Sequence, residues 1–538
     1  MAHGRDQVTF GSMSVRVRYA PSPTGSPHVG NIRTALFCHL FAKRHGGVNI
    51  LRLEDTDRSR TVPGCEEEIL ESLRWIGVEW QEGPDAGGPH APYRQSERAE
   101  AGVYTRIANE LIEKGHAYKA FDTPEELEEM RRIQEAGKLS IGYFGGDWRD
   151  APASKAEDAE RAGKPFVIRL KIPRGRKIVC EDAIRGPIEF DSDTVDDPVL
   201  IKADGMPTYH CAAMADDRLM GITHVFRGEE WIGSAAKHVW LYAAMGWEQP
   251  VWVHVPVILG NDGKKLSKRH GDTRCLDYRA AGYLPEALAN FIALIGWAPG
   301  GDRELMSLRE MEEAFDISGL QPSAGVFDLE KLDWMNGNAI RQLSLGELAA
   351  RVREYVSHPE TAEHWLKPEH AGSATGEALL LLENTLRSDE PFATRALALE
   401  QERVTTLADF GAACAFFFQD EPPMDESAVA KWFGEAHVRA LFDNLIAWLE
   451  DPPPPVADSS RQGEGVGGEG SGPDADAIER FLRAWAESHG FEKLGPIVHP
   501  VRVALTGKTA GPGLFELMEA LGTDRMVRRL KRAMELLR

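Results

Sequence analysis

The residue types best suited to chemistry gather in a loop near the start of the chain, where residues 18–30 read RYAPSPTGSPHVG. Alternating apolar residues before this loop predict a strand, and an apolar stripe of helical period after it predicts a helix. Gly25 and Gly30 allow a close approach of the backbone, and Asn31 could cap the helix. A helix N-terminus beneath such a loop favours bound phosphate, so the segment predicts a nucleotide site with His28 at the start of the helix.

A basic loop appears much later in the chain, where residues 263–271 read GKKLSKRHG. Lys265 and Lys268 lie three residues apart and can contact different oxygens of a triphosphate as point charges. Taken alone, such a run is as typical of a solvated basic loop. The pair of segments, rather than either one, indicates a nucleotide site.

Arg18 suggests what the second substrate is. It lies at the carboxyl end of the first predicted strand, on the side where open α/β sheets bind ligands. A guanidinium group there can hold a carboxylate through two parallel hydrogen bonds, which favours an acidic substrate. The alternative is an ordinary ion pair at a strand end.

The elements that must position these residues follow from the patterning. Residues 14–95 and 211–262 carry βα patterns that predict two halves of a Rossmann-type parallel sheet, and residues 96–210 between them predict an α+β insertion. From 345 to 538 the pattern is helical, interrupted by an acidic low-complexity linker at 451–475. The predicted fold class is therefore an α/β Rossmann-type catalytic domain with an α+β insertion, followed by an all-α C-terminal region.

Composition sets broad limits. The 538 residues carry a formal net charge of −22 and six cysteines, with no CxxC pair. Scattered cysteines suit a reducing compartment. The sequence also lacks an apolar run of about 18 residues and a secretory signal pattern. These features predict a cytoplasmic protein without a membrane segment.

Several segments together resemble one family. PSPTGSPHVG resembles the HIGH signature and KLSKR the KMSKS signature of class I aminoacyl-tRNA synthetases. The residues of both motifs are similar to those of bacterial glutamyl-tRNA synthetases. Four further segments resemble the same family: LRLEDTDRSR from Leu51, DGMPTYH from Asp204, DDRLMGITHVFRGEEW from Asp216 and VFDLEKLDWMN from Val326.

The resemblance implies a function and a use for each segment. It implies that L-glutamate is activated with ATP to glutamyl adenylate and transferred to the 3′ end of tRNA(Glu), through the 2′-hydroxyl and with tRNA bound first. It also implies Mg²⁺ with the ATP and a monomer, and it leaves open whether tRNA(Gln) is a substrate. Residues 96–210 would bind the acceptor stem, 263–344 would hold the KMSKS loop and a stem-contact domain, and 345–538 would bind the anticodon.

The resemblance also implies site residues. His28, Lys265 and Lys268 would be catalytic, because they supply donors and positive charge to the phosphates. ATP would contact these lysines together with Gly30, Asn31, Glu230, Trp231 and Ile258. Glutamate would be held by Arg18, which contacts its side-chain carboxylate, by Glu54, which contacts its ammonium group, and by Ala20, Ser22, Tyr209 and Arg227.

Two departures from the family pattern affect these expectations. Asn31 replaces the second histidine of HIGH, and asparagine can donate a hydrogen bond but carries no charge. Many members open a zinc site with Cys-x-Cys in the insertion, but this chain has Ala120 and Asp122 there. Since the four ligands cannot be assembled, the sequence predicts no structural zinc and no other bound metal besides Mg²⁺.

A net negative charge is unexpected for a protein that binds tRNA, because phosphate contacts need Lys and Arg. Basic residues nevertheless cluster on the KKLSKR loop and on the last predicted helix. For that helix, which includes Arg525, Arg528 and Arg529, a tRNA contact and a solvated charged face are both open.

Four other functions are less consistent with these residues. A P-loop ATPase is excluded, because TGKT at 506–509 lacks the first glycine and has Arg502 in its place. A glutaminyl-tRNA synthetase has a first motif that resembles PEPNG, and a glutamyl enzyme for a modified tRNA base ends before the helical tail. A non-catalytic tRNA-binding protein would not need both His28 and Lys268.

Overall fold

The computed structural model describes residues 14–57, 59–267, 274–365, 375–451 and 472–537. They divide into two compact units, which are Met1–Leu276 with Pro285–Leu332, and Asp277–Leu284 with Asp333–Arg538. Two of the boundaries between the units fall inside helices, one in α9 (Cys275–Ala280) and one in α12 (Leu329–Gln342).

Parallel strands form the centre of the first unit. One parallel pair is β1 (Arg16–Tyr19) with β2 (Val48–Leu51), and another is β8 (His224–Gly228) with β9 (Val251–Val255). The Thr223 N–H donates to the Arg16 carbonyl oxygen at 2.9 Å, which places β8 beside β1. The two halves predicted from the sequence thus meet at β1 and β8, and the predicted Rossmann-type arrangement is confirmed.

Helices cover this sheet because their apolar stripes are buried against it. The residues 29–44 of α1 connect β1 to β2, and most of their apolar side chains are inaccessible to solvent. Tyr242 and Trp252, both 1% exposed, pack edge to face with ring centroids 6.0 Å apart. The other elements of this part are α1 (Val29–Arg44), α2 (Cys65–Trp75), α3 (Gln95–Glu100), α4 (Val103–Glu113), α7 (Tyr209–Leu219), η2 (Glu229–Trp231), α8 (Ile232–Met245), β10 (Ile258–Leu259), α10 (Pro285–Leu294), α11 (Leu308–Ala314), η4 (Ile317–Gly319) and β11 (Gly325–Val326).

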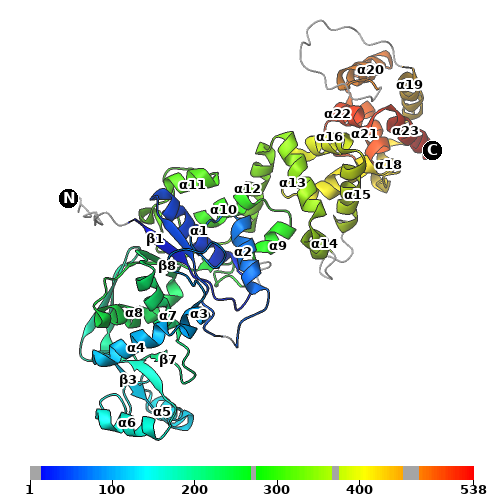
Figure 1. The fold of residues 1–538 in the computed structure, drawn as a ribbon. Coiled ribbons are helices and arrows are strands. Elements are labelled where there is room, and N and C mark those ends of the chain that lie inside the picture. Colours follow the sequence, from blue (N-terminus) through cyan, green and yellow to red (C-terminus); the bar gives the residue numbers. More distant parts are fainter. Residues whose placement is uncertain (1–13, 58, 268–273, 366–374, 452–471, 538) are drawn as a thin grey trace. The chain divides into compact units, whose positions relative to one another are not determined.

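A three-stranded antiparallel sheet lies in the range predicted for the insertion. Its strands β3 (Ala117–Ala120), β4 (Val167–Leu170) and β7 (Val199–Ile201) are accompanied by α5 (Pro124–Gly137) and α6 (Ala153–Arg161). In Figure 1, β3, α5 and α6 gather at one end of the first unit, away from β1 and α1. The same range contains η1 (Ser192–Thr194) and the hairpin of β5 (Lys177–Asp182) and β6 (Gly186–Asp191), and β5 pairs with β9.

Polar and aromatic side chains surround Asp122, which follows strand β3 in the insertion. The Tyr143 hydroxyl donates to Asp122 Oδ2 at 2.7 Å, and the Arg169 guanidinium carbon lies 3.8 Å from the centre of the Tyr143 ring. Among the residues that the structure describes, no group of three or more His, Cys, Asp or Glu could hold a metal ion.

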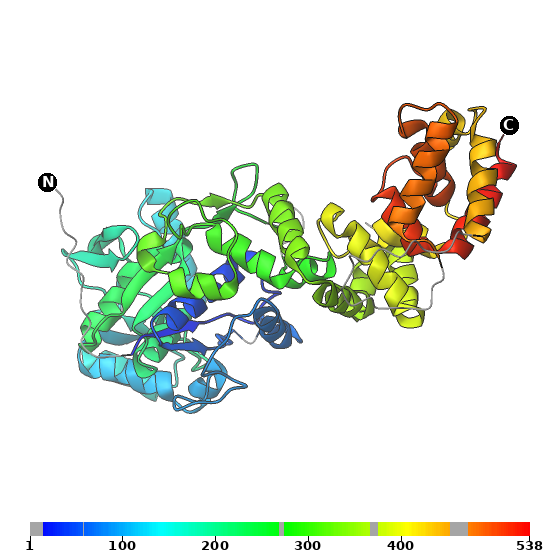
Figure 2. The ribbon, with the colours of Figure 1, turned by 90° about the horizontal axis from the view of Figure 1, so that it is seen from above.

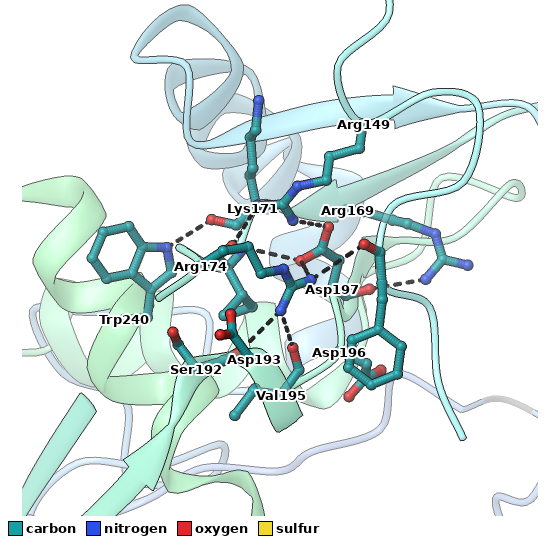
Figure 3. A network of polar contacts seen from close by, with 12 residues as sticks. Arg149, Arg169, Lys171, Arg174, Ser192, Asp193, Val195, Asp196, Asp197 and Trp240 are labelled. Carbon is teal, nitrogen blue, oxygen red and sulfur yellow. Dashed lines mark hydrogen bonds and ion pairs between the residues drawn. The ribbon is translucent and has the colours of Figure 1, made fainter. Parts of the chain in front are cut away.

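Asp197 is the centre of a buried polar network in this region (Figure 3). Its Oδ2 accepts from the Tyr118 hydroxyl at 2.8 Å and from Arg149, and its Oδ1 accepts from the Ile172 N–H at 3.0 Å and from Arg174 at 3.1 Å. Because the Asp197 carboxylate is fully buried, each of these donors compensates part of its lost hydration. The network therefore crosslinks β3, β4 and the segments that flank β7.

The described residues of the second unit beyond Asp333 form helices joined by loops, with no strand among them, which confirms the predicted all-α region. In Figures 1 and 2 its C-terminal helices, coloured orange to red, gather into a bundle. Residues 452–471, most of the predicted linker, lie outside the described residues. The helices are α13 (Leu345–Ser357), α14 (Pro359–Trp365), α15 (Thr375–Ser388), α16 (Glu390–Glu400), η6 (Gln401–Arg403), α17 (Asp409–Phe418), α18 (Glu426–Trp432), α19 (Val438–Glu450), α20 (Ala475–Ser488), α21 (Gly495–Thr506), α22 (Leu514–Leu521) and α23 (Thr523–Glu535).

Arg529 on α23 has a structural role that the sequence did not predict. It is 2% exposed, and its guanidinium group donates to the carbonyl oxygens of Leu505 at 2.6 Å and of Phe416 at 2.7 Å. These oxygens lie in the last turns of α21 and α17, where carbonyl groups lack partners within the helix and attract a cation. Arg529 therefore belongs to the core of the bundle rather than to a surface that binds tRNA.

Two further sequence features can be compared with the structure. All six cysteines are buried and form no disulfide. Within the described ranges, we find no helix with the length and apolar character needed to cross a membrane.

We expect Asp197→Asn to lower the free energy of local unfolding of the insertion by about 3 kcal/mol, because an amide cannot accept at both positions and leaves buried cations unpaired. Hydrogen exchange of β4 and β7 measures this change. Asp196→Asn is the matched control, since this neighbouring carboxylate is 31% exposed and forms an ion pair with Lys237 at 2.6 Å at the edge of the network. Equal exchange in the two variants would contradict a central role for Asp197.

Candidate active site

A cavity of about 520 Å³ lies at the carboxyl ends of β1 and β8. Parallel strands place their carboxyl ends at one edge of a sheet, and ligands of open α/β sheets bind there. The loops after β1 and β2 and the N-terminal end of α7 complete its wall. Its lining brings together many of the predicted site residues, which are Arg18, Ala20, Ser22, Asn31, Glu54, Tyr209, Arg227, Glu230 and Trp231.

Arg18 is held inside the protein by a buried carboxylate. It is 3% exposed, and its Nε donates to Asp217 Oδ1 at 2.9 Å. The same oxygen accepts from Arg52 Nη1 at 2.7 Å. Burial alone would raise the pKa of Asp217, but the two guanidinium groups hold it below its usual value. Asp217 therefore stays ionised and fixes two arginines beside the cavity.

Glu54 presents a carboxylate to the same cavity. Its Oε1 accepts from Arg52 Nη2 at 3.1 Å, and the side chain is 6% exposed. Burial raises the pKa of Glu54, although Arg52 and Arg18 act in the opposite direction. A positively charged ligand group near Glu54 would stabilise its ionised form.

Two aromatic rings form a flat surface in the cavity. Tyr209, the first residue of α7, stacks on Trp231 of η2 with ring centroids 3.9 Å apart and planes 25° apart. Burial raises the pKa of Tyr209 to about 12, so its phenol stays protonated at neutral pH and can donate a hydrogen bond. A stacked pair of this kind can accept a further planar group, such as a nucleobase.

The N-terminus of α1 is capped by His28, whose Nδ1 accepts from the Gly30 N–H at 3.2 Å. The prediction that Asn31 caps this helix is wrong, because the helix begins at Val29 and Asn31 lies in its first turn. Since Nδ1 accepts, the neutral imidazole carries its proton on Nε2, from which it can donate to a ligand. Burial, together with the charge of Lys265, lowers the pKa of His28.

The basic loop begins with a tight turn after β10. The Gly260 N–H donates to the Lys264 carbonyl oxygen at 2.8 Å, and the Leu266 N–H donates to that of Ile258 at 2.9 Å. Lys265 is thereby opposite Leu259 in a short antiparallel bridge. His28, Gly30, Ile258 and Lys265 are not part of the cavity lining, although the charge of Lys265 acts on His28. Lys268 lies outside the described residues.

Asp217 and Arg52 are the functional residues that the sequence reasoning missed. Both are fully buried, and both contact residues of the cavity wall. The available signal was the pair Asp216 and Asp217 within the apolar run CAAMADDRLM, because carboxylates on a buried helix need cationic partners. The cavity lining also adds Thr24, Thr34, Asp57, Arg60, Lys202 and Thr208.

Comparison with family models assigns both parts of the chain. Residues 14–334 match the model of tRNA synthetases class I (E and Q), catalytic domain. Residues 347–459 and 471–534 match the model of an anticodon binding domain.

Whole proteins agree with these matches. A glutamate-tRNA ligase of Thermus thermophilus is 41% identical over 525 residues, covering 97% of this chain and 100% of the relative. That of Herpetosiphon aurantiacus is 39% identical, covering 94% of each. The crystal structure of a glutamate tRNA ligase from Elizabethkingia meningosepticum in complex with its amino acid has a TM-score of 0.82 at 36% identity, over 98% of this chain and 100% of that one.

These matches confirm the resemblance predicted from the sequence motifs, and they extend it over nearly the whole chain. Class I synthetases use ATP as a substrate, which agrees with the nucleotide binding predicted from the two signature loops. The chain belongs to the class I tRNA synthetases for glutamate and glutamine, and it carries their catalytic domain followed by an anticodon-binding domain.

Proposed function

We propose that this chain is a glutamate-tRNA ligase whose amino-acid site is the cavity at the ends of β1 and β8. One observation carries the assignment of the site: among the charged side chains that line this cavity, the buried ones are the guanidinium groups of Arg18 and Arg227 and the carboxylate of Glu54. This set complements a substrate with two carboxylates and one ammonium group, which describes L-glutamate. The full-length similarity to glutamate-tRNA ligases supports the same assignment.

In this proposal Arg18 binds the side-chain carboxylate of glutamate and Glu54 binds its ammonium group. Arg227 and Tyr209 complete the site, beside Ala20 and Ser22. The buried ion pair with Asp217 orients Arg18 before substrate arrives, so little conformational entropy is lost on binding.

The first reaction step joins two anions. An oxygen of the glutamate α-carboxylate attacks the α-phosphorus of ATP, the bond to the bridging oxygen breaks, and pyrophosphate leaves. We assign the N-terminus of α1, with His28, Gly30 and Asn31, to one side of the phosphates, and Lys265 and Lys268 to the other. Trp231, Glu230 and Ile258 would hold the adenosine. Fixed donors and cations around the phosphorus stabilise the charge that develops there.

Mg²⁺ would enter with ATP. It usually keeps several waters and is bound through substrate phosphates and one or two carboxylates. Mg²⁺ would supply charge neutralisation to the phosphates, and the side chains named above would align them.

In the second step the 2′-hydroxyl of the terminal adenosine of tRNA(Glu) attacks the carbonyl carbon of the adenylate, and AMP leaves. We propose that the insertion contacts the acceptor end and that the C-terminal region contacts the anticodon. We also propose that the protein is a cytoplasmic monomer.

We expect Arg18→Gln to lower kcat/KM for glutamate about 100-fold while KM for ATP changes less than about threefold, because the variant loses a charge-assisted contact to one substrate only. Steady-state charging of tRNA(Glu) measures both constants. Arg16→Gln is the control, since Arg16 lies on the same strand, pairs with Glu82 and does not line the cavity. An equal loss for ATP would indicate a general defect and contradict the assignment.

Lys265→Ala should lower kcat about 30-fold with less than a threefold change in KM for glutamate, because the lysine acts on charge that develops at the phosphates. Rapid-quench measurement of adenylate formation would show the loss in the first step. The neighbouring Lys264→Ala is the control. If both variants lose activity equally, the loop acts only through its overall charge.

The unmodified enzyme should charge tRNA(Glu) with labelled glutamate, and pyrophosphate exchange should require tRNA. Strong exchange without tRNA would contradict the proposed order of binding. Parallel charging of tRNA(Gln) decides between an enzyme restricted to tRNA(Glu) and one that accepts both. Failure to charge either tRNA would contradict the proposed function.

A further inference from the structure

A chain of buried polar side chains extends from Arg227 away from the cavity. Arg227 Nε donates to His254 Nε2 at 2.9 Å, and His254 Nδ1 lies 2.7 Å from Asp182 Oδ2. On the other side, Arg227 Nη1 lies 2.9 Å from His238 Nδ1, and His238 Nε2 lies 3.0 Å from His210 Nδ1. We call Asp182, His254, His238 and His210 the arginine-support chain. Its two histidines next to Arg227 are completely buried.

These contacts fix where each proton lies. A carboxylate can only accept, so His254 carries its proton on Nδ1, and its Nε2 accepts from Arg227. A guanidinium group can only donate, so His238 accepts through Nδ1 and carries its proton on Nε2, toward His210. Burial lowers the pKa of His254, of His238 and, to about 4, of His210. All three imidazoles are therefore neutral at pH 7.

Arg227 is consequently held in place without being neutralised. No carboxylate of the described residues lies within ion-pair distance of it, whereas Arg18 contacts Asp217 directly. The face of Trp252, 4.7 Å from the guanidinium carbon, supports it further. Within the described part of the chain, Arg227 Nη2 has no hydrogen-bond partner. The guanidinium group that these contacts fix belongs to a residue that lines the cavity.

We propose that Asp182, His254 and His238 are positioning residues for substrate binding, which hold the guanidinium group of Arg227 at the cavity so that its charge can bind a carboxylate of glutamate. The inference rests on the proposed function, in which the cavity binds glutamate. A carboxylate in direct contact with Arg227 would orient it equally well, but it would compete with the substrate for the same charge. A neutral imidazole avoids this competition, and Asp182 fixes its tautomer from one residue further away.

Replacement of His254 tests the inference. We expect His254→Phe to raise KM for glutamate at least about tenfold and to change KM for ATP less than about twofold, because Arg227 loses a partner while the nucleotide site is untouched. His254→Gln keeps an oxygen that can accept from Arg227 Nε, so its KM for glutamate should stay within about threefold of the unmodified value.

His39→Phe is the matched control for the loss of a buried histidine. His39 is 1% exposed, lies on α1 and contacts Glu312 at 2.9 Å, and it does not line the cavity. This variant should keep its KM for glutamate within about twofold, whatever its effect on thermal stability. A rise in the KM for glutamate equal to that of His254→Phe would overturn the inference.

A double-mutant cycle decides whether His254 acts through Arg227. In an Arg227→Ala background, His254→Phe should change KM for glutamate less than about threefold, because the group that it positions is gone. Equal factors in both backgrounds would overturn the inference.

The outcome for the unmodified enzyme separates the two proposals. If it fails to charge tRNA with glutamate, the proposed function and this inference fail together. If it charges tRNA but the cycle is additive, only the positioning role fails.

Discussion

The cavity depends on keeping guanidinium groups charged and fixed where water is excluded. Removal of one partner of a buried ion pair lowers the free energy of unfolding by roughly 3 to 5 kcal/mol, because the other charge is left buried and unpaired. Asp217 on α7 meets this requirement for Arg18 on β1 and for Arg52 just after β2. One carboxylate thereby joins three segments that are far apart in the sequence, and the shape of the cavity follows from their attachment.

The two arginines that face the cavity are supported in different ways. Arg18 forms an ion pair with Asp217, which is itself shared with Arg52, so its charge is compensated in part. Arg227 is supported by neutral imidazoles and by the face of Trp252, and no carboxylate of the described residues forms an ion pair with it. A substrate with two carboxylates would therefore contact one cation that is already paired, Arg18, and one that is not, Arg227. In the proposed complex this unequal pair would bind the two carboxylates of glutamate, and the empty site leaves only one of the two buried arginines without a paired carboxylate.

The features that could be predicted from the sequence are those that short continuous segments of the chain determine. The βα patterns predicted the fold class, and the resemblance of short continuous segments to one family predicted nine of the 21 residues that line the cavity. The support of Arg227 could not be predicted in this way, since Asp182 and His254 lie on different strands that meet only in the folded sheet. His254 within VWVHV looks like an ordinary core residue of a strand. The cap of α1 was misassigned to Asn31 because propensity favours asparagine, whereas the fold begins the helix at Val29 and uses His28.

Two buried polar networks of this chain differ in where they lie: the Asp197 network belongs to the insertion, and the network around Arg227 borders the cavity. Both carboxylate oxygens of Asp197 accept from donors of the described residues, so nothing remains for a ligand and the network acts as a crosslink. Next to the cavity, two buried polar atoms, Arg227 Nη2 and Asp217 Oδ2, have no hydrogen-bond partner in the described part of the protein. The two networks use the same residue types. What separates them is that Arg227 lines the cavity, whereas Asp197 does not.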